Sequence, residues 1–181
     1  MFKNMNIFAT PALNIITFLG RNPRDSYYVR ELAKILSIST GAASEQLRAL
    51  EVSGLVTSEQ RGRTLLFRAR ISHPLVREAK IFSTLNELMP LITAAGDASQ
   101  RMILFGSCAT GEDTARSDID LYFETTERPA VSGLVARYGP ELSRKISPII
   151  VLPEEAAQLR TRDRPLFVRI QAGRLLAGEP L

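Results

Sequence analysis

The stretch FGSCATGEDTARSDIDLYF, residues 105–123, constrains the fold of this chain more than any other segment. The apolar run that leads into it, residues 102–105, predicts a buried strand that ends at a Gly-Ser turn. Residues 118–123 then alternate polar and apolar side chains, as a second strand does. The residues between are small and polar and include a second glycine. We therefore predict two neighbouring strands joined by a short polar segment.

The polar residues of this stretch have the chemistry of a phosphate and metal site. Asp118 and Asp120 stand at i and i+2 on the second strand, so both carboxylates point to one side and can share a divalent cation. Mg²⁺ prefers such oxygen ligands, completed by water and substrate phosphates. Gly106 lets the backbone approach a polyphosphate closely, and the Ser107 hydroxyl can hold a phosphate oxygen. These are the parts of a phosphoryl-transfer site.

The whole stretch resembles the signature of the minimal nucleotidyltransferases of the DNA polymerase beta-like superfamily. That signature is a hydrophobic residue, Gly-Ser, some ten residues, and then Asp-hydrophobic-Asp-hydrophobic, here FGS at 105–107 and DIDL at 118–121. The resemblance extends over about residues 90–178. It implies that Gly106 and Ser107 bind a nucleoside triphosphate. It also implies that Asp118 and Asp120 are catalytic residues that bind Mg²⁺.

Active members of that superfamily use a third carboxylate on a later strand, which the resemblance places in RKISPIIVL, residues 144–152. This segment contains no Asp or Glu. Ser147 and Pro148 occupy the expected position, and the proline indicates an edge or irregular strand. Other acids lie further along the aspartates' strand or flank the later strand, namely Glu124, Glu141 and Glu154. Loss of a catalytic base typically costs about 10²–10⁴-fold in rate. The missing acid therefore argues against transfer, but not against binding of Mg²⁺ with a nucleoside triphosphate.

The first part of the chain has helical patterns followed by a hairpin pattern. Three helical patterns, separated by a turn and by the four-residue connector SIST, cover residues 10–20, 27–36 and 41–53. Thr10 can cap the first helix, Gly20 suits its end, and Gly54 suits the end of the third. Residues 55–70 then show strand, glycine-centred turn and strand, with arginines at the tip. This order predicts a winged helix-turn-helix.

In a winged helix-turn-helix the second helix of the motif can lie in the major groove, while the hairpin reaches adjacent phosphates. Phosphate contacts would supply affinity and base-edge contacts specificity. By position, the residues that we expect to contact double-stranded DNA are Ser39, Thr40, Gly41, Ser44 and Arg48 on or near this helix, and Arg61 and Arg63 on the wing.

The segment YVRELAKILSISTGAASEQLRALEVSGLVTSEQRGRTLLFRA is similar to the winged-helix domains of the arsenical-repressor-like bacterial and archaeal regulators. It matches them in helix lengths, in the ending of the recognition helix and in the Gly-Arg wing turn, over about residues 10–72. The resemblance implies DNA binding and regulation of transcription. Winged helices also mediate protein contacts, so a protein-binding role stays open.

Residues 73–90 predict a connecting helix with an apolar stripe of Leu75, Ala79 and Phe82, continued by Leu85 or Leu88. Such a stripe can pack in the core or pair with a second chain, and two-fold DNA readers need two recognition helices, so a homodimer is possible. We therefore expect an α+β protein with a winged helix-turn-helix at 1–72, this helix at 73–90 and a nucleotidyltransferase-like small mixed sheet flanked by helices at 91–181.

Composition narrows the function classes. The net charge of +4 favours an anionic partner, and one cysteine with one histidine excludes a disulfide framework and disfavours zinc. We find no membrane-spanning run and no convincing signal peptide, so we expect a cytoplasmic protein. The favoured hypothesis is a DNA-binding regulator that binds Mg²⁺ with a nucleoside triphosphate. The alternatives are an active nucleotidyltransferase that moves NMP to a protein or small molecule, and a toxin–antitoxin-type component that acts through protein contacts.

Overall fold

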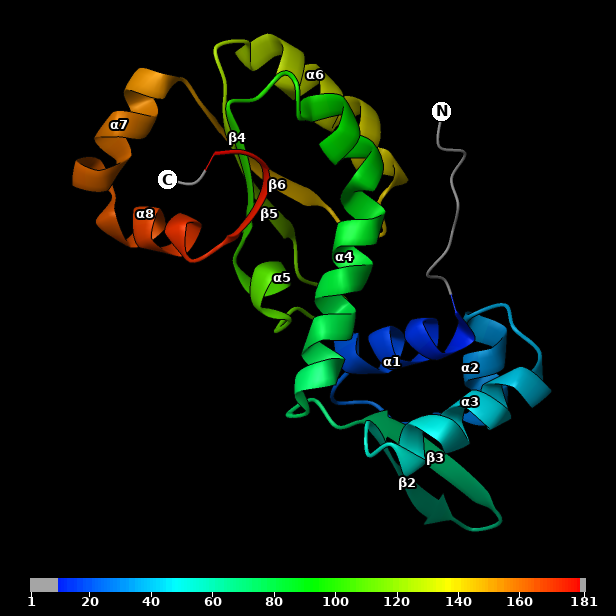
Figure 1. Ribbon diagram of the computed structural model, residues 1–181. Coiled ribbons are helices and arrows are strands. Elements are labelled where there is room, and N and C mark those ends of the chain that lie inside the picture. The colour runs from blue at the N-terminus through cyan, green and yellow to red at the C-terminus, as the bar shows by residue number, and fades with distance from the viewer. Residues whose placement is uncertain (1–9, 180–181) are drawn as a thin grey trace. The chain divides into compact units, whose positions relative to one another are not determined.

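The computed structural model describes residues 10–179 (Figure 1). The chain divides between Ser83 and Thr84 into two compact units. Each unit contains helices and a sheet, which confirms the predicted α+β class. The division falls inside the helix that we expected to connect two domains.

The first unit has the predicted order of helices followed by a hairpin. Its helices and strands before the connecting helix are α1 (Pro11–Arg21), β1 (Tyr27–Tyr28), α2 (Val29–Ile35), α3 (Thr40–Val52), β2 (Val56–Arg61) and β3 (Thr64–Ala69). The strands form an antiparallel sheet in the order β1-β3-β2. The predicted helix-turn-helix and its hairpin wing are therefore present.

Local signals explain where these helices begin and end. The Thr10 side chain accepts a hydrogen bond from the Leu13 amide, at 3.3 Å, and so caps α1. Ser39 does the same for α3 by accepting from the Ala42 amide at 3.1 Å. Gly54 follows α3 with a φ of +74°, the left-handed conformation that glycine adopts at helix ends.

Two expectations about these helices are wrong. Gly20 does not end α1 but lies buried inside it, where an added Cβ would come within 3.1 Å of Val76 and Lys80. It is small because another helix packs closely there, and this is a tertiary requirement. The second helix does not begin at residue 27, because Tyr27 and Tyr28 pair with β3 as a short strand.

The connecting helix is longer than predicted. α4 (Pro74–Ala95) continues through Pro90 and ends five residues beyond the expected limit. Proline removes one backbone donor inside a helix, but Leu91 and Ala95 are both fully buried in the core of the second unit, and this burial outweighs the lost hydrogen bond. The predicted apolar stripe is also shifted, since Leu75 is 60% exposed while Val76 is buried.

The second unit is built on a mixed sheet. After α4 come β4 (Arg101–Phe105), α5 (Ser107–Thr110), β5 (Ile119–Glu124), α6 (Arg128–Tyr138), the short 3₁₀ helix η1 (Gly139–Glu141), β6 (Ile146–Val151), α7 (Pro153–Arg162), α8 (Arg164–Gln171) and β7 (Arg174–Gly178). The strand order is β6-β5-β4-β7, with β5 and β6 parallel and the other pairs antiparallel. The predicted small mixed sheet with flanking helices is confirmed.

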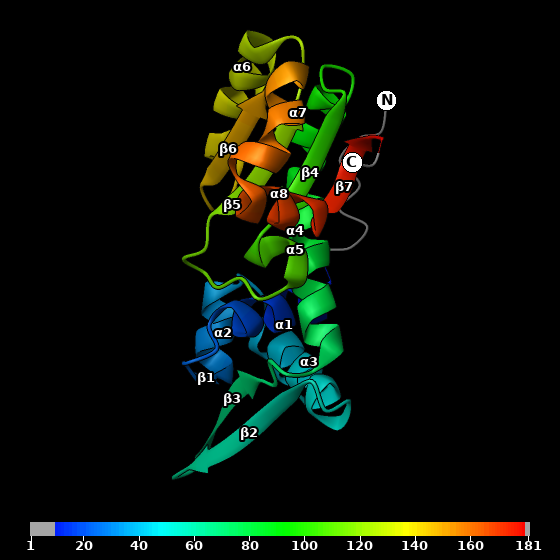
Figure 2. The ribbon, with the colours of Figure 1, turned by 90° about the vertical axis from the view of Figure 1, so that its left-hand side faces the viewer.

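Helices cover both faces of this sheet (Figure 2). Ile119, Leu121 and Phe123 of β5 pack with residues of α4 and α6 in the larger core. Tyr122 points to the opposite face and packs with residues of α7 and α8, among them Ile170. The alternation predicted for residues 118–123 therefore holds, although both faces of β5 are covered over most of its length.

Candidate functional site

The candidate DNA interface is the outer side of α3 together with the tip of the wing. Ser39 caps α3, and Thr40 and Gly41 form its first turn; all three are exposed. Arg48 is exposed one turn after the half-buried Ser44, so the two lie on the same side of the helix. The structure thus brings the predicted α3 residues onto one accessible surface.

The wing is a tight hairpin. Arg61 pairs with Thr64, which leaves a two-residue turn of Gly62 and Arg63. Gly62 has a φ of +61°, the conformation that such turns require at their first position. Arg61 and Arg63 are exposed at this tip. Both predicted wing cations are therefore available to phosphate.

A hydrogen bond within the first unit joins the wing to α3. The Ser58 hydroxyl of β2 donates to the Glu51 carboxylate in the last turn of α3. The sequence pattern did not indicate this contact, because the two residues belong to different elements. It ties the orientation of the hairpin to that of the predicted recognition helix.

The second candidate site lies where β4 ends beside β5. Phe105, the last residue of β4, pairs with Asp120, and Gly106 follows immediately. Gly106 has φ +69° and ψ −155°, and a Cβ there would come within 2.3 Å of the Asp120 Oδ2. Both the backbone conformation and the close approach of the carboxylate require glycine. Ser107 begins α5 directly after this turn.

The two aspartates interact electrostatically at the start of β5. Asp118 is exposed one residue before β5, and Asp120 is half-buried within it. Burial raises the pKa of the Asp120 carboxyl above its ordinary value, and the negative charge of Asp118 raises it further, while the Arg169 guanidinium acts in the opposite direction. Two carboxylates of this kind attract a cation.

Ser147 occupies the register position beside Asp120. In the parallel pair of β5 and β6, Asp120 pairs with Ser147 and Leu121 with Pro148, so Ser147 shares the face of Asp120. β6 is an edge strand, as the proline indicated. Glu124 forms an ion pair with Arg101 at the opposite end of β5, and Glu141 and Glu154 are exposed elsewhere.

The donor set fits a single hard cation. Within residues 10–179, no group of three or more His, Cys, Asp or Glu side chains could hold a metal ion. Asp118 and Asp120 supply carboxylate oxygens that suit Mg²⁺ when water and phosphate oxygens complete the shell. The described residues therefore fit a cation held jointly by two aspartates and a phosphate ligand, and they do not fit a three-carboxylate cage.

Arg169 of α8 lies beside this site. Its Nη2 lies 3.8 Å from the Asp120 Oδ2, and its guanidinium carbon lies 5.6 Å from the centre of the Phe105 ring. The sequence leaves two roles open for the four arginines near the C-terminus, contact with phosphate or exposure on the surface, and favours the second; they are Arg162, Arg164, Arg169 and Arg174. The amphipathic α8 buries Ile170 on the sheet and leaves the side chain of the neighbouring Arg169 60% exposed.

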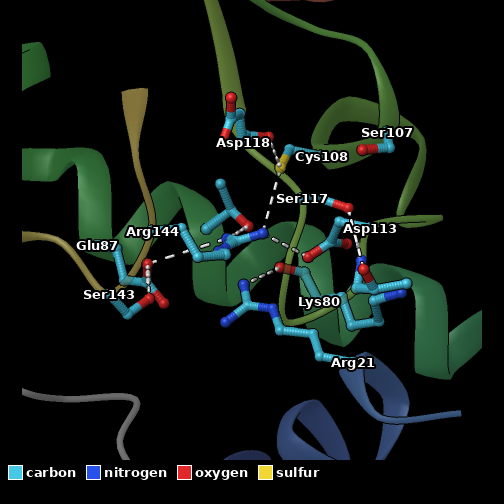
Figure 3. A network of polar contacts seen from close by, with 12 residues as sticks. Arg21, Lys80, Glu87, Ser107, Cys108, Asp113, Ser117, Asp118, Ser143 and Arg144 are labelled. Carbon is cyan, nitrogen blue, oxygen red and sulfur yellow. Dashed lines mark hydrogen bonds and ion pairs between the residues drawn. The ribbon is translucent and has the colours of Figure 1, made fainter. Parts of the chain in front are cut away.

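A buried arginine, Arg144, is linked through Cys108 to the backbone of Asp118 (Figure 3). Arg144, 4% exposed, donates to the Asp113 carboxylate at 2.7 Å and to the Thr84 hydroxyl at 2.9 Å. It also donates to the Cys108 sulfur, whose thiol donates to the Asp118 carbonyl at 3.3 Å. This chain of contacts links α4, α5 and the residue before β5.

Comparison with known proteins gives one match, which lies within the first unit. The family described as "Bacterial regulatory protein, arsR family" matches residues 12–58, which run from α1 into β2. No curated protein matches the chain. The match supports a DNA-binding transcriptional regulator. None of the helices within residues 10–179 is long and apolar enough to cross a membrane.

Proposed function

We propose that this protein is a DNA-binding transcriptional regulator whose second unit has the nucleotidyltransferase type of fold and binds Mg²⁺ with a nucleoside triphosphate. The DNA-binding part rests on the family match over α1 to β2 together with the exposed face of α3. The nucleotide part rests on one observation, the glycine turn at Gly106 held against the Asp120 carboxylate.

For DNA, the first turn of α3 and Arg48 would contact base edges in the major groove, while Arg61 and Arg63 contact the phosphates alongside. An arginine that neutralises a phosphate releases a counterion, so binding weakens as salt concentration rises. Two such modules would read a two-fold site, and we propose a homodimer for this reason.

The DNA experiment compares two double variants that lose the same charge. Arg48→Ala with Arg61→Ala should weaken binding and flatten the dependence of log K on log salt by about 0.9 per lost phosphate contact. Arg137→Ala with Arg160→Ala, both exposed in the second unit, should bind as the parent does. Equal affinities of the two double variants would refute the proposed interface.

For the nucleotide, Asp118 and Asp120 would hold the cation, and Ser107 with the Gly106 turn would contact phosphate oxygens. Mg²⁺ bound between the two aspartates would neutralise part of the negative charge of the phosphates. Asp118 is exposed and Asp120 half-buried, so both can exchange water for ligand oxygens. Ser147 stands beside Asp120 and cannot accept a proton from an attacking hydroxyl as a carboxylate does, so we propose binding without efficient transfer.

The nucleotide experiment is calorimetric titration with Mg²⁺ and each of the four nucleoside triphosphates. Asp118→Asn with Asp120→Asn should abolish binding, while Asp97→Asn, an exposed position outside the site, should not change it. Absence of binding by the parent protein would refute the proposal. Transfer of label from α-labelled ATP that disappears in Asp118→Asn would instead establish the alternative, an active nucleotidyltransferase.

A further inference from the structure

The position of Arg169 is fixed by the packing of the helix that carries it. Asp163 caps α8 by accepting from the Leu166 amide at 3.0 Å, and Leu166 and Ile170 pack on the sheet face beside Phe105. This places the Arg169 stem at the end of β4, next to the glycine turn. α8 therefore positions the Arg169 guanidinium at the same place where β5 positions the Asp120 carboxylate.

The contacts of Arg169 are weak enough to change. Its side chain is 60% exposed, and its separation from Asp120 of 3.8 Å is that of an ion pair without a short hydrogen bond. Ion pairs of this exposure contribute little stability, because water solvates both partners well. The guanidinium also lies over the Phe105 ring, 5.6 Å from its centre, and this contact does not involve Asp120.

A divalent metal ion and the Arg169 guanidinium compete for the Asp120 carboxylate. A divalent cation on Asp118 and Asp120 repels a guanidinium at this distance, whereas a polyphosphate beside the cation attracts it. Guanidinium groups bind phosphate oxygens through paired, charge-assisted hydrogen bonds. Because Phe105 lies at the end of β4, directly before Gly106 and Ser107, a guanidinium kept over its ring stays within the region proposed to hold phosphate.

We propose that Arg169 exchanges partners when the site fills: it neutralises Asp120 in the empty protein and binds the phosphates of the nucleotide in the loaded one. This inference rests on the proposed metal and nucleotide binding by Asp118 and Asp120. Arg169 thus lowers the affinity of the site for a metal ion alone and raises its affinity for a metal ion bound to a nucleotide. The site would then discriminate a metal–nucleotide complex from free metal.

The test measures two affinities in the chain of 181 residues. They are the affinity for Mn²⁺ alone, by electron paramagnetic resonance, and the affinity for ATP in the presence of Mn²⁺, by calorimetry. Arg169→Gln should bind Mn²⁺ alone more tightly, by up to about fivefold, because a competing ion pair of modest strength is removed. The same variant should bind ATP about tenfold or more weakly, because a charge-assisted hydrogen bond to phosphate is lost. Arg164→Gln, at the exposed start of the same helix, should change neither affinity.

The proposal requires that Arg169→Gln raise the affinity for Mn²⁺ alone and lower the affinity for ATP. Changes of the same sign, or no change, in Arg169→Gln would overturn the exchange while leaving the metal site intact. No binding of ATP in the presence of Mn²⁺ by the parent protein would overturn both the site and the exchange. If Arg169→Gln does not fold, Arg169→Lys provides the measurement: it keeps the charge but not the planar fork, so Mn²⁺ affinity should be retained and ATP affinity reduced.

Discussion

The buried ion pair between Arg144 and Asp113 should dominate the stability of the second unit. The Arg144 side chain is 4% exposed and that of Asp113 is 0% exposed, with 2.7 Å between the Nη1 and the Oδ2. Removal of one partner of such a pair leaves the other charge desolvated, at a cost of about 3–5 kcal/mol. Arg144→Met should therefore destabilise the second unit by this amount.

A matched control lies on the surface of the same unit. Arg128 pairs with Glu155, but both side chains are more than 40% exposed. Because water solvates these charges, Arg128→Met should cost no more than about 1 kcal/mol. A third variant, Arg144→Met with Asp113→Leu, should be less destabilised than the sum of its single changes, by about 0.5–3 kcal/mol.

The assay is hydrogen exchange of the β5 amides under native conditions, followed by mass spectrometry. A chain of two compact units need not unfold in one step, and exchange measures the opening of this sheet by itself. Additive effects of Arg144→Met and Asp113→Leu, or a cost for Arg144→Met as small as that for Arg128→Met, would refute the argument.

Three further predictions follow from single residues. Gly106→Ala should destabilise the second unit by at least about 1–3 kcal/mol and weaken Mn²⁺ binding, since the backbone conformation is nearly exclusive to glycine and the new Cβ displaces Asp120; unchanged urea unfolding would contradict this. Burial raises the pKa of Tyr122 to about 12. The folded state therefore holds the phenol proton more tightly than the unfolded state, and this contribution to stability is complete below about pH 10 and is lost as pH rises toward 12. Tyr122→Phe should therefore resist alkaline unfolding better than the parent, as followed by circular dichroism. Ser39→Ala should cost about 1 kcal/mol through loss of the hydrogen bond from the Ala42 amide, and equal exchange rates in α3 would count against the cap.

Local signals were enough to predict much of the fold. Thr10, Gly54 and the wing turn at Gly62 act through hydrogen bonds and backbone angles of a few adjacent residues, and the structure has each of them where the pattern indicated. The pair of Asp118 and Asp120 was predictable for the same reason, because strand geometry relates residues two positions apart.

Other features depended on residues far apart in the chain. Gly20 is explained by Val76 and Lys80, and the continuation of α4 past Pro90 by burial in the core of the second unit. No local pattern contains these partners, so local rules gave the wrong helix ends. The assignment of DNA, metal and nucleotide contacts to particular residues stays a prediction that the experiments above test.

By itself, the sequence determined the order of helices and hairpin in the first unit, the strands on either side of the Gly-Ser turn, and the presence of two aspartates beside that turn, since short-range hydrogen bonding and side-chain periodicity control these features. The resemblance placed Ser147 and Pro148 at the position of the third carboxylate. Only the tertiary structure decided that Ser147 is the one that shares the face of Asp120, that the Arg169 guanidinium lies 3.8 Å from the Asp120 carboxylate, and that Arg144 is buried against Cys108. These contacts join β5 to β6 and to α8, and α5 to the loop before β6. They depend on how the strands register and how the helices pack, and such long-range contacts are not encoded in any single stretch of the chain.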